Sequence, residues 1–216
     1  LRRQLLLAGA GGLTLAAAPV ARAQGERAVL PSMTEGPFYP PRRWREREAD
    51  WDADLTRVRR GAQTLVARGE HLGLQLAVAD TRGRAVDGAE VEIWQCDAAA
   101  VYHHPDVRTA PGEGDAGFQG FGAATADRDG RVRFRTIRPV AYPGRTPHIH
   151  VKLRHASFGE WTSQLFVAGD PGNERDFLWR SLKPASREAA TLRLARAAGG
   201  DDGLVWSSQV VLVLPA

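Results

Sequence analysis

The residues best suited to chemistry are two histidines separated by a single residue. His148 and His150 stand in a segment whose alternate positions are apolar, namely Ile149, Val151 and Leu153. Successive side chains of a β-strand point to opposite faces, so both imidazoles would share one face while the apolar residues face the core. Because imidazole is the commonest metal ligand, the pattern indicates a metal site on a rigid strand. The alternative is a pair of surface histidines.

A tyrosine and an arginine precede these histidines in a proline-rich segment. Tyr142 and Arg145 lie among Pro139, Pro143 and Pro147. Proline has no backbone N–H to donate to a β-ladder, so this stretch is predicted to be a loop. Loops on a rigid scaffold are where binding and catalytic residues concentrate. The segment is therefore predicted to be a functional loop that leads into the histidine strand.

The elements that must position these residues are short strands separated by turns. Alternating or β-branched segments occur at 74–78, 89–95, 131–135, 161–167 and 204–214, with turn signals at 80–84 and 129–130. Short strands spaced by turns predict an all-β fold, an antiparallel β-sandwich with long active-site loops and one or two short helices.

The remaining segments carry weaker signals. Residues 187–198 are rich in Ala, Leu and Arg and end at two glycines, which predicts a helix. Residues 42–60 are charged without a clear period and are predicted to be surface loop, and 170–173 is a turn cluster. Cys96 is the single cysteine, so no intramolecular disulfide can form, and we expect it to be a small buried residue on a strand.

The first 23 residues have the layout of a secretory leader. Arg2 and Arg3 precede a mildly apolar run to Val20, and the small-x-small pattern of a cleavage site ends at Ala23. Adjacent arginines are typical of the twin-arginine export route. The alternative, a membrane anchor, needs about 20 apolar residues, and this run is shorter and broken by Pro19. We therefore expect export to the periplasm or beyond, and one domain over residues 24–216.

The charge balance narrows the classes of partner. The chain carries a formal charge of +4, and the leader contributes three arginines and no acid, which leaves +1 for residues 24–216. This balance does not indicate nucleic-acid binding. It is typical of a soluble surface of mixed charge, with no stable membrane anchor once the leader is removed.

Four ordered motifs resemble those of the intradiol ring-cleavage dioxygenases, the family of catechol, hydroxyquinol and protocatechuate dioxygenases. The motifs are Thr34–Tyr39, Val91–His104, Arg135–Leu153 and Gln164–Pro171. The resemblance implies a non-haem ferric ion, Fe(3+), as cofactor. It also implies insertion of both atoms of O2 into a small aromatic diol, which gives a cis,cis-muconate-type diacid.

The resemblance also assigns residues to roles. Tyr102, Tyr142, His148 and His150 correspond to the family's metal ligands. Ferric iron is a hard cation that favours anionic oxygen beside imidazole, and a phenol can ionise when such a cation binds it. The alternative for both tyrosines is a core or rim aromatic role.

Arg145 matches the family's active-site arginine, which would stabilise negative charge, and Gln164 matches a glutamine that supports it. The alternatives are a surface cation and a polar residue on a strand face. His103 and His104 are not assigned as ligands, because a loop histidine pair is more often solvated or at the pocket mouth.

The chain departs from the family pattern in three places. Ala100 stands where the family usually has glycine, which would strain a turn that needs positive φ. The segment from Tyr142 to His148 is much shorter than in the well-known catechol and protocatechuate enzymes, where it forms a loop that partly walls the substrate pocket. This predicts a more open pocket for substituted catechols or lignin-derived fragments. The helical N-terminal dimerisation region of the catechol dioxygenases is also absent, so any homo-oligomer would use the sandwich itself.

Two competing functions are a non-catalytic periplasmic module that binds a metal or a ligand, and a zinc or copper site at the histidine pair. A non-catalytic module would be expected to have lost one of the two tyrosines or Arg145, and Tyr102, Tyr142 and Arg145 are all present. The second is disfavoured because two tyrosines suit ferric iron better.

Overall fold

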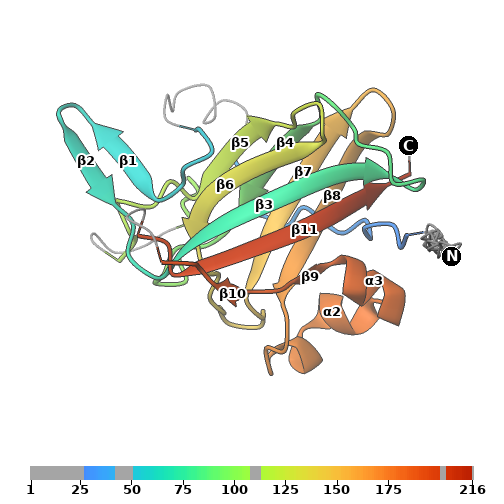
Figure 1. Ribbon diagram of the computed structural model, residues 1–216. Coiled ribbons are helices and arrows are strands. Elements are labelled where there is room, and N and C mark those ends of the chain that lie inside the picture. Colours follow the sequence, from blue (N-terminus) through green and yellow to red (C-terminus); the bar gives the residue numbers. More distant parts are fainter. Residues whose placement is uncertain (1–26, 42–50, 108–112, 200–202, 216) are drawn as a thin grey trace, which may run out of the picture.

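The computed structural model describes residues 27–41, 51–107, 113–199 and 203–215 (Figure 1). The predicted leader over residues 1–23 lies outside them. The elements in chain order are β1 (Arg57–Arg60), β2 (Gln63–Val66), β3 (His71–Asp80), β4 (Glu90–Trp94), β5 (Phe121–Thr125), β6 (Arg131–Ile137), β7 (His148–His155), β8 (Gly159–Val167), the 3₁₀ turn η1 (Asn173–Arg175), α2 (Phe177–Ser181), α3 (Pro184–Ala189), β9 (Thr191–Leu192), β10 (Ala195–Arg196) and β11 (Trp206–Leu214).

Two sheets packed face to face confirm the predicted β-sandwich. One sheet has the strand order β10-β11-β3-β6 and the other β5-β4-β7-β8-β9. In Figure 1 the strands β3, β6 and β11 cross in front of β4, β5, β7 and β8. Most neighbouring strands are antiparallel, but β11 pairs with β3, and β9 with β8, in parallel. The hairpin of β1 and β2 forms a separate two-stranded sheet that projects from one end of the sandwich.

A single apolar cluster fills the space between the two sheets. Its members come from alternate positions of β3, β4, β6, β7, β8 and β11, and include Leu74, Ile93, Phe134, Val151 and Leu212. The alternation that predicted strands therefore also identified the inward faces. The opposite face of β4 and β7 carries polar and aromatic residues instead, and this is where the site forms.

The late helix is much shorter than its sequence predicted. Its helical part, α3, ends at Ala189, and Thr191–Leu192 then joins β8 as strand β9. The Thr191 hydroxyl donates to the Arg187 carbonyl at 2.6 Å, which satisfies one of the last carbonyls of the helix. Sheet pairing thus overrides the helix propensity of the residues after Ala189.

The prediction of surface loop over residues 42–60 is wrong for its second half. Leu55 and Thr56 are fully buried, and Arg57–Arg60 forms strand β1. The glycine at 122 makes room for Leu55, since a Cβ there would lie 2.4 Å from its Cδ1 atom. Residues 42–50 lie outside the described part. Cys96 is buried as predicted, but it follows β4 and does not lie on it.

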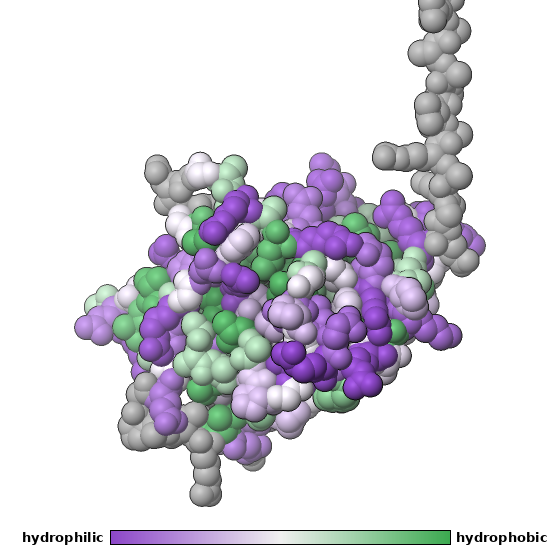
Figure 2. All heavy atoms as spheres, turned by 90° about the horizontal axis from the view of Figure 1, so that it is seen from below, coloured by the Kyte–Doolittle hydropathy of each residue, from purple (hydrophilic) through white to green (hydrophobic). Residues whose placement is uncertain are grey.

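The surface shows no single dominant character. Figure 2 views the end of the sandwich that carries α2 and α3, where hydrophobic residues lie in several separate areas among hydrophilic ones. Within the described residues, no helix is long and apolar enough to cross a membrane.

Candidate active site

Strand β7 places both histidines on the outer face of the five-stranded sheet. His148 and His150 are 2% and 3% exposed, while Ile149 and Val151 between and after them lie in the core. The prediction from alternation is therefore confirmed. Trp94 on the neighbouring strand β4 is paired with His150 and stacks on its ring, with centroids 4.6 Å apart and planes within 13°.

Tyr102 reaches the same point from the loop that follows β4. Its side chain is 6% exposed. The fully buried Asp97 holds the loop, since its carboxylate accepts backbone N–H groups of Ala99 at 2.8 Å and Val101 at 3.0 Å. Ala100 has φ +64°, and it is the one non-glycine residue with positive φ among the described residues. The strain expected for an alanine at this glycine position is thus present in the fold.

Three potential ligand atoms converge beside the outer face of β7. The hydroxyl oxygen of Tyr102 lies 3.1 Å from Nε2 of His150 and 3.5 Å from Nε2 of His148. The two Nε2 atoms are 3.2 Å apart. Atoms bound to one cation at about 2.0–2.1 Å stand roughly 3 to 3.5 Å from one another. The spacing is therefore that of neighbouring ligands around one ion.

Both imidazoles offer lone pairs. His148 donates from Nδ1 to the carbonyl of Thr146 at 2.6 Å, so in the neutral ring its Nε2 carries the lone pair. Burial lowers the pKa of His148 to about 4, with a smaller contribution from Arg145. Burial also lowers the pKa of His150 well below its ordinary value, helped by its neighbours His148 and Arg145. Both rings are consequently neutral at pH 7, the form that binds metals.

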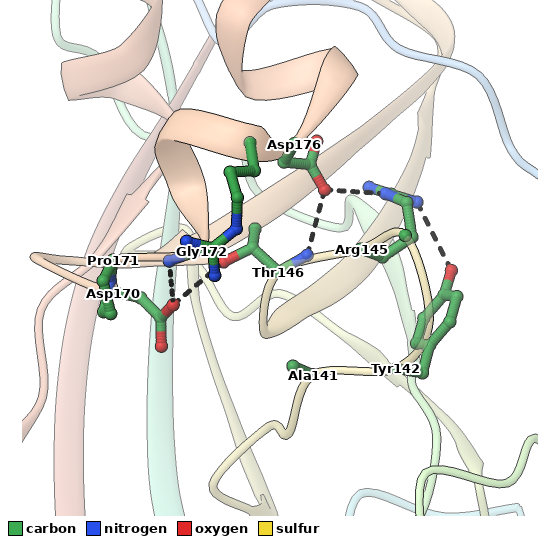
Figure 3. Close-up of a pocket in the computed structure, with 10 residues that line it drawn as sticks. Ala141, Tyr142, Arg145, Thr146, Asp170, Pro171, Gly172 and Asp176 are labelled. Carbon is green, nitrogen blue, oxygen red and sulfur yellow. Dashed lines mark hydrogen bonds and ion pairs between the residues drawn. The ribbon is translucent and has the colours of Figure 1, made fainter.

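Tyr142, Arg145 and Gln164 lie together next to this cluster. Arg145 donates from Nη2 to Oε1 of Gln164 at 2.5 Å and from Nη1 to the hydroxyl of Tyr142 at 3.4 Å. Figure 3 shows Tyr142 and Arg145 side by side on the loop before β7. The Tyr142 ring lies 5.6 Å from Tyr102 and 5.5 Å from His148, centroid to centroid. The fold thus brings together all six residues singled out from the sequence.

Burial makes both phenols resist ionisation in the absence of a cation. It is the main cause of the raised pKa of Tyr102, reinforced by Tyr142. Burial also raises the pKa of Tyr142, although Arg145 opposes the shift. A strong cation between the rings would reverse this, because it stabilises phenolate directly.

The donor set fits a hard, highly charged cation such as a ferric ion. Two phenols that can become anionic face two neutral imidazoles, the mixture that Fe(III) favours over soft ligands. In the described part of the chain, no group of three or more His, Cys, Asp or Glu side chains could hold a metal.

A cavity of about 440 Å³ opens beside Tyr142 and Arg145. Arg175 and Asp176 also line it, together with the turn at Asp170 (Figure 3). Pockets of about 300–1,000 Å³ hold small molecules. Of the six residues singled out from the sequence, Tyr142 and Arg145 border this cavity, whereas Tyr102, His148, His150 and Gln164 do not line it.

Sequence reasoning missed several residues that support the site. Asp176 is buried against Arg145, and Phe38 stacks on Tyr102 with ring centroids 4.5 Å apart. His103 and His104, which were not assigned as ligands, are less solvated than expected, because their side chains are 22% and 5% exposed. His103 lies 3.2 Å from the Asp97 carboxylate, so it supports the Tyr102 loop.

The chain is similar to known dioxygenases in sequence. A family model described as Dioxygenase matches residues 34–212. The protocatechuate 3,4-dioxygenase beta chain of Burkholderia cepacia is 35% identical over 157 residues, which cover 67% of this chain and 63% of that relative. The catechol 1,2-dioxygenase of Candida albicans is 26% identical over 120 residues, covering 47% of this chain and 38% of the relative. The chain thus spans less than two thirds of the length of either relative.

Solved structures show the same likeness. The dioxygenase domain of a dioxygenase and carbohydrate-binding fusion protein from a cellulolytic Streptomyces species superposes with a TM-score of 0.60 at 26% identity, covering 86% of this chain and 97% of that one. Catechol 1,2-dioxygenase from an Acinetobacter species gives a TM-score of 0.62 at 22% identity, covering 87% and 63%.

Proposed function

Because this chain belongs to the intradiol ring-cleavage dioxygenase family, we propose that it inserts both atoms of O2 into catechol-type aromatics, giving cis,cis-muconate-type diacids. The observation that carries the proposal is the convergence of Tyr102, His148 and His150 within 3.5 Å, next to Tyr142 and Arg145. A non-haem ferric ion held there would bind the diol and activate it toward dioxygen.

The two tyrosines would have different roles. Tyr102 is buried and belongs to a loop that Asp97 holds through backbone hydrogen bonds, so we expect it to be a permanent ligand. Tyr142 is half-buried on an exposed turn that borders the cavity. It is therefore the ligand that can give way to substrate, and its phenolate oxygen would then accept a proton from a substrate hydroxyl.

Arg145 would supply fixed positive charge beside the reacting ring. It is held by Gln164 and by a buried carboxylate, so its position is set before substrate arrives. Preorganised charge of this kind stabilises negative charge that develops during reaction, and its loss typically costs a few kcal/mol of barrier. Arg145→Ala should therefore retain iron and lose rate.

We also propose a permissive substrate range that includes substituted catechols or lignin-derived fragments. The support for it is the short segment from Tyr142 to His148, which places Tyr142 on an exposed turn. A panel of substituted catechols should give turnover rates within about one order of magnitude. A narrow preference for one catechol would contradict the open-site part of the proposal.

Two further parts of the proposal concern the whole protein. We propose that residues 1–23 direct export through the twin-arginine route to the periplasm or the medium. Any homo-oligomer would form through the sandwich, whose surface carries a nearly balanced charge after removal of the leader.

The ligand assignment predicts different outcomes for two tyrosine substitutions. Tyr102→Phe removes a proposed ligand, so iron retention and turnover should be lost. Tyr39→Phe is the matched control, because Tyr39 is the remaining tyrosine and its hydroxyl bonds to Glu92 at 2.6 Å and Arg154 at 3.0 Å, away from the histidines. It should lose about 1–3 kcal/mol of stability and keep its iron.

Iron content by elemental analysis and turnover by oxygen uptake check both variants. An active, iron-loaded Tyr102→Phe protein would remove Tyr102 from the ligand set. Loss of iron from Tyr39→Phe as well would mean that the experiment reports general damage. A wild-type protein that binds iron and cleaves no catechol would favour a non-catalytic binding module.

A further inference from the structure

Asp176 is a buried carboxylate that contacts Arg145 directly. The residue is 1% exposed, and its Oδ2 atom accepts from Nε of Arg145 at 2.8 Å and from the backbone N–H of Thr146 at 3.1 Å. Its Oδ1 atom accepts the backbone N–H groups of Leu178 at 2.9 Å and Trp179 at 3.1 Å, which caps helix α2. Each carboxylate oxygen thus accepts two hydrogen bonds, Oδ2 from the loop of the site and Oδ1 from helix α2.

The surroundings keep this carboxylate charged. Burial alone would raise the pKa of Asp176, but hydrogen bonds from the Arg145 guanidinium and from backbone N–H groups outweigh it and lower the pKa. The Arg145 side chain is only 11% exposed, so the pair lies largely out of water. A charged hydrogen bond in such a place holds geometry firmly.

Asp176 completes the set of contacts around the guanidinium. Nη2 meets Gln164, Nη1 meets Tyr142, and Nε meets Asp176. The ring of Phe177, which follows Asp176, lies 5.3 Å from the guanidinium carbon. Asp176 is the one anionic partner among them, and it approaches from the side away from Tyr142 (Figure 3).

The same carboxylate also reaches a histidine through the backbone. By accepting the N–H of Thr146, Asp176 fixes the peptide unit that precedes this residue. The Thr146 hydroxyl is bound in turn to Asn173 at 2.8 Å, and its carbonyl accepts Nδ1–H of His148 at 2.6 Å. The Asp176 carboxylate is therefore linked to two groups of the site, directly to the Arg145 guanidinium and through Thr146 to the His148 imidazole.

We propose that Asp176 is a positioning residue that orients Arg145 toward the substrate and, through Thr146, directs the Nε2 lone pair of His148 toward the metal position. The effect of Asp176 on catalysis rests on the proposed function. Partners of this kind set the direction of ligands and charges, and their loss typically weakens metal affinity or activity 10–100-fold.

Asp176→Ser separates positioning from helix capping. Serine is as good an N-cap as aspartate, so α2 keeps its cap, but its single short oxygen cannot also reach Arg145. The matched control is Asp80→Ser, since Asp80 is also buried, accepts backbone N–H groups and binds Arg84 Nε at 2.6 Å far from the site.

The first readout uses the metal-free protein. In wild type, NMR should show the Arg145 Nε–H and His148 Nδ1–H protons protected from exchange with water. In Asp176→Ser, the Arg145 proton should exchange at least tenfold faster and the His148 signal should shift. In Asp80→Ser both signals should stay as in wild type. Unchanged signals in Asp176→Ser would overturn the proposal.

The second readout is a double-mutant cycle on the iron-loaded enzyme. Asp176→Ser should lower kcat for catechol about 10- to 100-fold in the wild-type background, and by a clearly smaller factor in an Arg145→Gln background, where only the route through Thr146 to His148 remains. Asp80→Ser should leave kcat within twofold. An equal loss in both backgrounds would overturn the proposal, because Asp176 would then act independently of Arg145.

Two provisions keep the test decisive. If Asp176→Ser does not fold, the isosteric Asp176→Asn takes its place. The asparagine amide has only one accepting oxygen, so its NH2 group must face N–H donors either at Arg145 or at the start of α2. The variant should therefore show the same faster exchange of the Arg145 proton, or lose the cap of α2. Unchanged exchange together with an intact cap would overturn the proposal. If wild type cleaves no catechol, the proposed function fails, and the NMR readout still decides whether Asp176 positions Arg145.

Discussion

At the scale of single residues, burial decides which forms the proposed ligands take. His148 and His150 are neutral because burial lowers their pKa values, and Tyr102 and Tyr142 stay protonated without a cation because burial raises theirs. Binding of the proposed ferric ion would therefore be coupled to ionisation of the phenols. The imidazoles already have the neutral form that binds metals, whereas the phenols would ionise only when a cation binds.

Ala100 carries backbone strain that one substitution should relieve. A non-glycine residue at φ +64° is destabilised by roughly 1–2 kcal/mol, while glycine loses some of this gain through its freer unfolded state. Ala100→Gly should therefore raise the free energy of unfolding by about 0.5–1 kcal/mol, measurable as a higher midpoint in urea. Ala99→Gly is the control at an exposed neighbouring position, and it should be neutral or destabilising. A lower midpoint for Ala100→Gly would refute the strain.

Residue patterns reveal some of the site and miss the rest for a physical reason. Alternation along one strand was enough to put His148 and His150 on the same face. Asp176 could have been read as the N-cap of a short helix, but its bond to Arg145 joins residues 31 positions apart. Such a contact depends on the fold, so no local pattern shows it.

At the scale of elements, loops carry the site and hydrogen-bonded carboxylates hold the loops. Asp97 accepts backbone N–H groups from its own loop and from Asp115 at 2.6 Å, which ties the Tyr102 loop to a second one. Asp176 holds the other site loop through Arg145 and the backbone N–H of Thr146. The late helix and the 42–60 segment were predicted less well, because sheet pairing and the space above Gly122 decide their structure.

Asp97 should contribute to stability in a pH-dependent way. Burial would raise its pKa, but the hydrogen bonds from His103 and from backbone N–H groups lower it overall. A lowered native pKa stabilises the fold above the unfolded value of about 3.9, and this contribution is lost as the pH falls toward the native pKa. Asp97→Asn should therefore be less stable at pH 7 and lose less stability between pH 7 and pH 3.

Urea unfolding at both pH values measures this difference. Asp106→Asn is the control on the same loop, because the Asp106 side chain is 84% exposed. It should keep the pH dependence of wild type. If Asp97→Asn lost as much stability as wild type on acidification, Asp97 would not be the titrating anchor.

At the scale of the whole molecule, the sandwich keeps the core and the site on opposite faces of one sheet. The inner faces of both sheets form one apolar cluster, and the outer face of β4 and β7 supports the histidines and tyrosines. Alternating short strands predicted this architecture correctly. The two parallel pairings join strands far apart in sequence, so local patterns did not predict them.

The proposed export route makes a prediction about the intact precursor. Replacing Arg2 and Arg3 together by lysine keeps the charge and removes the adjacent arginines, so the protein should stay in the cytoplasm. Cell fractionation followed by immunoblotting measures the distribution. Unchanged export of the double-lysine protein would contradict the twin-arginine assignment.

The measurement that tests the central claim most directly is a visible absorption spectrum of the iron-loaded protein in air, before and after catechol is added. Tyrosinate bound to ferric iron should give a red charge-transfer band, and Tyr102 and Tyr142 both lie beside the histidine pair. The band should change when catechol binds and return as a muconate-type product accumulates. A colourless protein that retains iron would show that the tyrosines are not ligands and would contradict the account.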